Sequence, residues 1–89
     1  MNQDLLDLCQ KYVQTAGELG SVNEAIDAQN QLQRSDREAR DAARRLKQPT
    51  PEATYDKTAY ILLGAKRTSL NERMKQIEGE LKRYFRYHD

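Results

Sequence analysis

The apolar residues near the start of the chain recur with the spacing of a helix. They lie at alternating steps of four and three residues: Leu5, Cys9, Tyr12, Ala16 and Leu19. Because an α-helix completes a turn in 3.6 residues, these positions share one face. With Asn2 as the capping residue, the pattern predicts a first helix over residues 2–19.

A break between this helix and the next is predicted between Gly17 and Ser21. Glycine weakens a helix interior, and Ser21 followed three residues later by Glu24 has the form of a capping box. We therefore expect a second helix over residues 22–47. Its two heptad positions hold Ala25, Leu32, Ala39 and Leu46, and Val22, Gln29, Asp36 and Ala43. Since polar residues fit poorly in a symmetric coiled coil, we expect this seam to pack against other helices of the same chain.

The firmest predicted boundary is the segment Gln48-Pro49-Thr50-Pro51, because proline ends one helix and favours the first turn of the next. The pattern predicts a third helix over residues 51–87. Its heptad positions hold Leu63, Leu70, Ile77 and Tyr84, and Tyr60, Arg67, Met74, Leu81 and His88. An alternative interpretation makes residues 59–65 a short strand and starts the helix at Ser69.

Together these elements predict an all-α fold with a single domain over residues 1–89: an elongated three-helix bundle made of a helical hairpin and a short first helix. If the turn centres near Pro49, residue n of the third helix lies beside residue 98 − n of the second, which places Ile77 beside Ser21. The twelve residues after Ile77 would then project by ~18 Å as an overhanging C-terminal helix.

The composition fits a small helical protein with a thin core. Of the 89 residues, 37% are hydrophobic and 33% are charged, which suffices for a seam between helices. The net charge is +1, but residues 1–31 carry five acidic residues and one basic residue for a net charge of −4, which leaves +5 for residues 32–89. That asymmetry suits attraction between helices and is too weak by itself to indicate nucleic-acid binding.

The sequence offers few residues for catalysis or metal binding. Cys9 is the only cysteine and His88 the only histidine, and they lie near opposite ends of the chain. A metal site needs several converging ligands, and a nucleotide site needs a glycine-rich loop with a lysine, so we expect no metal, no cofactor and no enzyme activity. The lone cysteine, the acidic N-terminus and the absence of a long apolar run favour a cytoplasmic protein without a membrane segment.

A basic stripe is predicted on the second helix, formed by Arg37, Arg40, Arg44 and Lys47. These residues fall at steps of three, four and three, so they share one side of a helix and could follow the phosphates of a nucleic acid. Acidic residues interrupt the stripe, and the side chains could equally cover the apolar seam with their aliphatic stems. We favour this structural interpretation.

The candidate partner-binding site lies at the C-terminus. It combines an apolar strip with cationic and aromatic neighbours: Leu81, Tyr84, Phe85, Tyr87, Arg83 and Arg86. Aromatic residues surrounded by arginine are typical of protein-binding hot spots and also occur in single-strand nucleic-acid binders.

From this site we expect a non-enzymatic protein interaction module, such as a small inhibitor or assembly adaptor, that binds another protein or forms a homodimer. Small charged helical proteins of phages and other mobile elements share this size and composition, but no motif links them to this chain. A nucleic-acid-binding accessory protein is the alternative, and salt dependence of binding would distinguish it.

Overall fold

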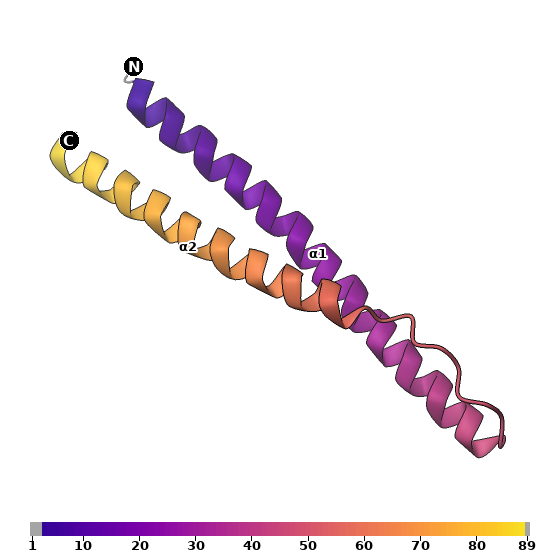
Figure 1. The fold of residues 1–89 in the computed structure, drawn as a ribbon. Helices are drawn as coiled ribbons and strands as arrows, with labels where there is room; N and C mark the ends of the chain where they lie inside the picture. The colour runs from indigo at the N-terminus through magenta and orange to yellow at the C-terminus, as the bar shows by residue number, and fades with distance from the viewer. Residues whose placement is uncertain (1–2, 89) are drawn as a thin grey trace.

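In a computed structural model, the chain is an antiparallel hairpin of two long helices (Figure 1). The structure describes residues 3–88, and the side chains of residues 3–86. Helix α1 spans Gln3–Arg45 and helix α2 spans Lys57–His88. Within residues 3–88 the structure contains these two helices and no strand, so the all-α prediction is confirmed. The three-helix bundle and the alternative strand at residues 59–65 are wrong.

Helix α1 continues through the segment in which a break was predicted. The Ser21 hydroxyl donates a hydrogen bond to the Gly17 carbonyl oxygen at 3.3 Å, as a serine in a helix interior does, and caps no new helix. A glycine costs a helix about 1 kcal/mol, whereas burying a side chain such as Val22 or Ile26 stabilises it by about 1.5–3 kcal/mol. Packing of the residues after Gly20 against α2 therefore outweighs the two glycines. Asn2, the predicted cap, lies outside the described residues.

The core is a narrow seam between the two helices. Val22, Ile26 and Leu70 form its centre, and Leu70 is only 3% exposed. Leu63 and Ile77 occupy the same heptad position as Leu70. Leu63 is half-buried and Ile77 is buried, which confirms that this position faces the core. The radius of gyration is 20.7 Å, against about 12 Å for a compact chain of this length. The hairpin is therefore rod-shaped, with extents of 70 × 18 × 16 Å.

The end of α1 is a Schellman turn close to the predicted boundary. The amide of Gln48 donates to the carbonyl oxygen of Ala43 at 2.8 Å, and the amide of Lys47 donates to that of Arg44 at 3.3 Å. Lys47 takes the left-handed conformation that this motif requires, with a φ of 54°. Pro49 follows directly and prevents the helix from resuming. The chain therefore leaves α1 two residues before the predicted end of the second helix.

The connection between the helices corrects both the predicted start of the third helix and its register. Residues 48–56 are not helical, and Figure 1 shows them running back along α1. At ~3.3 Å per residue these nine residues span ~30 Å, which equals about 20 residues of helix. The amide of Asp56 accordingly lies beside the middle of α1, where it donates to Gln29 Oε1 at 3.1 Å.

Because α2 starts level with the middle of α1, its C-terminus reaches the N-terminal end of α1 (Figure 1). Arg73 pairs with Glu18 at 3.7 Å, and Ile77 lines the same hollow as Thr15, so it does not lie beside Ser21. The predicted overhang is therefore wrong. The first part of α1 lies alongside the last part of α2, and both termini share one end of the rod.

Candidate protein-binding surfaces

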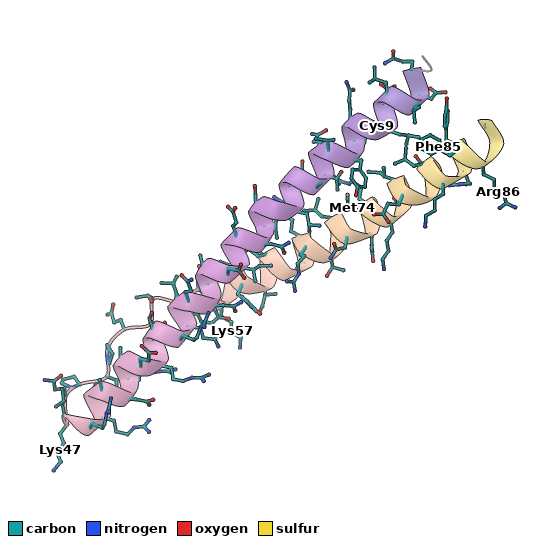
Figure 2. All side chains as sticks on the ribbon, turned by 180° about the vertical axis from the view of Figure 1, so that it is seen from behind. Cys9, Lys47, Lys57, Met74, Phe85 and Arg86 are labelled. Carbon is teal, nitrogen blue, oxygen red and sulfur yellow. The ribbon has the colours of Figure 1, made fainter. Side chains whose placement is uncertain are left out.

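The predicted C-terminal binding site lies on the last turns of α2, beside the start of α1 (Figure 2). Leu81 and Tyr84 are half-buried, and Tyr84 shares the core-facing heptad position of Leu70 and Ile77. Phe85 is 51% exposed. The structure thus separates the predicted apolar strip into two residues turned toward α1 and one ring that faces solvent. The side chain of Tyr87 lies outside the described part.

The exposed ring of Phe85 contacts one other aromatic ring, and two arginines are its near neighbours in the sequence. The rings of Tyr84 and Phe85 meet edge to face, with centroids 5.8 Å apart and planes at 87°. Arg83 is exposed and its Nε donates to the carbonyl oxygen of Gly79 at 3.4 Å. Arg86 is exposed, and Figure 2 shows it directed away from the helix pair. We call Phe85, Tyr84, Arg83 and Arg86 the C-terminal surface.

The structure keeps only part of the predicted basic stripe together. Arg37, Arg40 and Arg44 are exposed on α1 at helical spacing, but Lys47 lies beyond the end of the helix in the left-handed turn. Arg40 lines a hollow beside the connection together with Asp36, and its charge helps to lower the pKa of that carboxyl group. The role of the basic stripe stays a prediction.

A polar cluster that holds the connection against α1 was not identified from the sequence. The carboxylate of Asp36 accepts hydrogen bonds from the amide of Thr54 at 2.9 and 3.1 Å, from the Thr54 hydroxyl at 2.6 Å and from the amide of Tyr55 at 2.8 Å. These bonds lower the pKa of Asp36, that of the Thr54 hydroxyl most and that of the Tyr55 amide next, and burial opposes them. We call Gln29, Asp36, Thr54, Tyr55 and Asp56 the connection clamp.

The connection clamp also determines where α2 begins. Asp56 Oδ1 accepts a hydrogen bond from the amide of Ala59 at 3.0 Å, which is the N-cap arrangement. Tyr55 contacts Tyr60 with ring centroids 5.9 Å apart. The sequence did carry signals of this cluster, because Gln29 and Asp36 are polar residues at heptad positions and Asp56 precedes an apolar run. The role of these residues was missed because the connection was predicted to be helical.

A second apolar surface lies on the side of α1 that faces away from α2. It comprises Leu6, Cys9, Val13, Ala16 and Gly20, all of them exposed, and we call it the outer apolar face. Val13 is 70% exposed. Cys9 and Ala16 were predicted to share one face with Leu5 and Leu19. In the structure Leu5 and Leu19 are half-buried, whereas Cys9 and Ala16 are exposed. The sequence does indicate this second face, because the residues at positions 6, 9, 13, 16 and 20 are apolar or glycine and follow one another at steps of three and four.

The described residues contain no group of three or more histidine, cysteine, aspartate or glutamate side chains that could hold a metal ion. Cys9 is exposed, and the side chain of His88 lies outside the described part. Within the same part of the chain, neither helix is both long and apolar enough to cross a membrane.

Comparison of the chain with protein-family models, with curated proteins and with solved structures gives no match.

Proposed function

We propose that the protein is a non-enzymatic protein interaction module, of the kind that serves as a small inhibitor or assembly adaptor. The observation that carries this proposal is the exposure of Phe85 on the last turns of α2, a segment that also exposes the cations Arg83 and Arg86. Full burial of an exposed large aromatic side chain stabilises by roughly 1.5–3 kcal/mol, and a partner with an apolar pocket would recover the part of this free energy that corresponds to the exposed half of Phe85. Arginine at the rim suits a partner that presents acidic groups.

The shape of the hairpin supports binding through surfaces. Its seam is one side chain thick, and the hollow between the helices is lined mainly by polar and charged groups: Lys11, Gln14, Thr15, Arg73, Gln76, Ile77 and Glu80. Small-molecule sites are usually deeper and largely apolar, with a few converging polar groups. A cytoplasmic location is part of the proposal, because the exposed thiol of Cys9 remains reduced there.

The test is affinity capture from the native host with the wild-type chain, the Phe85→Ala variant and the Leu46→Ala variant, each with and without nuclease. Leu46 is the matched control, since it is an exposed apolar residue at the opposite end of the rod. A captured protein that is retained by Leu46→Ala and lost with Phe85→Ala supports the proposal. The purified partner should then bind Phe85→Ala about 30-fold more weakly, the loss expected of a hot-spot residue.

Two outcomes would contradict the proposal. Binding that survives Phe85→Ala would remove the C-terminal surface from the interaction. Capture that disappears on nuclease treatment, with an affinity that falls steeply as salt is raised, would favour nucleic-acid binding.

A further inference from the structure

The outer apolar face differs from the rest of this highly charged chain because it carries no charge. Only three charged residues occur between residues 5 and 23, and they are Asp7, Lys11 and Glu18. Their spacing of four and seven places them on one side of α1. That side adjoins α2, because Glu18 pairs with Arg73 and Lys11 lines the hollow between the helices. The outer side of the same helix is left without charges for about five turns.

Gly20 on the outer apolar face and Gly17 one turn before it have no explanation within the hairpin. A Cβ atom added at Gly17 or Gly20 would meet nothing within 4 Å, so no neighbouring segment of this chain requires the missing side chain. Glycine nevertheless lowers the stability of a continuous helix. A helix from another molecule that packs closely at these positions would account for both residues.

The large and small residues of the face are arranged so that it complements itself. Leu6 stands at one end, Val13 in the middle and Gly20 at the other end. An antiparallel contact with a second copy, centred on Val13, places Leu6 of each copy against Gly20 of the other. It also places Cys9 beside Ala16. A parallel contact would set leucine against leucine and glycine against glycine, which crowds one end and leaves a void at the other.

Charge and exposed area also favour a second copy as the occupant. A two-fold contact brings each residue near its own counterpart, and an uncharged face avoids the repulsion between like charges that would follow. The chain exposes 7241 Å², whereas a compact monomer of 10.3 kDa exposes about 5,400 Å². The excess over the whole rod is roughly 1,800 Å², which is more than twice the ~800 Å² that each partner contributes to a standard interface.

We infer that two copies of the chain pair in antiparallel orientation through the outer apolar face of α1, with Val13 near the two-fold axis. This goes beyond the proposed function, because it uses a different surface and leaves Phe85 available to another partner. The face is short, so the interface lies at the small end of the range for specific complexes, and we expect a dissociation constant of about 1–100 µM.

The pairing is tested with full-length chains by sedimentation equilibrium in reducing buffer, from about 1 to 500 µM. Val13→Lys should be monomeric throughout this range, since it places two like charges at the axis. Mixing Val13→Lys with Val13→Glu should restore a dimer that neither forms alone. Ile61→Lys is the control, an exposed apolar position on α2 at which the dimer should persist. A wild-type chain that stays monomeric at 500 µM, or a Val13→Lys variant that still dimerises, overturns the inference.

The orientation is tested by mild oxidation of a mixture of two full-length chains that each hold one cysteine. One is the wild-type chain, and the other carries Cys9→Ser with Ala16→Cys and a tag that separates the products by size. Antiparallel pairing gives mainly the mixed disulfide. Products that link like with like indicate a parallel contact. The control is a chain with Cys9→Ser and Glu52→Cys, whose thiol lies in the connection. Cross-linking of the test mixture no faster than that of this control also contradicts the inference. Loss of partner binding by Phe85→Ala bears only on the proposed function.

Discussion

Thr54 donates both its amide and its hydroxyl to the carboxylate of Asp36, eighteen residues earlier in the chain, and the hydroxyl bond is 2.6 Å long. This pair ties the non-helical connection to the side of α1. Hydrogen bonds to an ionised acceptor are stronger than those between neutral groups. These bonds, together with the contact of Tyr55 with Tyr60, hold the connection in place, and the register of the two helices follows from it.

Acidification should loosen the connection. The hydrogen bonds from Thr54 and Tyr55 hold the pKa of Asp36 below its ordinary value of 3.8. A carboxyl group with a lowered pKa stabilises the fold above its unfolded-state pKa, and the effect is lost as the pH falls through the folded-state pKa. We expect the wild-type melting temperature to fall between about pH 4 and pH 2 by more than that of Asp36→Asn. The control is Asp41→Asn, an exposed carboxylate on the same helix, and equal acid sensitivity of all three chains would contradict the role of Asp36.

Replacing Lys47 by glycine should stabilise the protein. Lys47 has a φ of 54°, a conformation that costs an L-residue about 1 kcal/mol and costs glycine almost nothing. For a chain of this size, that free energy corresponds to a rise of about 4–8 °C in melting temperature. Lys47→Ala keeps the Cβ atom and should leave the temperature unchanged, so circular dichroism melts of both variants separate strain from charge. Equal melting temperatures for Lys47→Gly and Lys47→Ala would contradict this account.

Asp56→Ala should destabilise the start of α2. Asp56 accepts the amide hydrogen of Ala59, and loss of such a cap costs about 0.5–2 kcal/mol. The expected result is a lower midpoint in urea, with faster hydrogen exchange at the amides of residues 57–60. Glu52→Ala, in the same connection but outside the connection clamp, should leave both measurements near their wild-type values.

Core and surface residues of α2 should differ sharply in their effect on folding. Leu70→Ala removes a side chain that is 3% exposed and should cost about 2–5 kcal/mol of unfolding free energy. Phe85→Ala should cost less than about 1 kcal/mol, since half of that side chain is already in water. Urea denaturation of the two variants gives the comparison. Equal losses would show that Phe85 is packed in the fold and unsuited to an intermolecular contact.

The basic stripe should prove dispensable for protein binding. Changing Arg37 and Arg44 to glutamine removes two exposed charges and should alter the unfolding free energy by no more than about 0.5 kcal/mol. Partner binding, measured by calorimetry at low and high salt, should change by less than about threefold. A large loss of affinity together with a lost mobility shift of RNA or DNA would support the nucleic-acid alternative.

The local pattern of the sequence was sufficient to predict the all-helical character of the chain and one of the two predicted breaks. The heptad series through Leu63, Leu70 and Ile77 identified the face that packs on α1, because burial follows the period of the helix. The break at Pro49 was also correct within a few residues, since proline lacks the amide hydrogen that a helix interior needs. These features depend on residues close together in the chain.

The features that failed depend on contacts between distant residues. Gly17 and Gly20 weaken α1 only slightly. The helix continues through them because Val22 and Ile26 pack against α2. Likewise, the residues after Pro51 are compatible with a helix, and it is Asp36 that keeps them extended. The placement of the candidate site changed with the register, so Tyr84 faces α1 while Arg83, Phe85 and Arg86 are exposed.

The position of the connection clamp implies an order of assembly for the whole rod. The bonds between Asp36 and Thr54 close a loop of 18 residues, whereas contacts at the open end join the first residues of the chain to the last. Closing that larger loop directly costs roughly 1.2 kcal/mol more entropy, by ~0.6 kcal/mol per doubling of its length. The two helices should therefore zip together from the connection toward the termini, and the terminal end should be the last part to form and the first to fray. Because the C-terminal surface and the outer apolar face both lie at that end, a molecule that binds there also stabilises the pairing of the two helices.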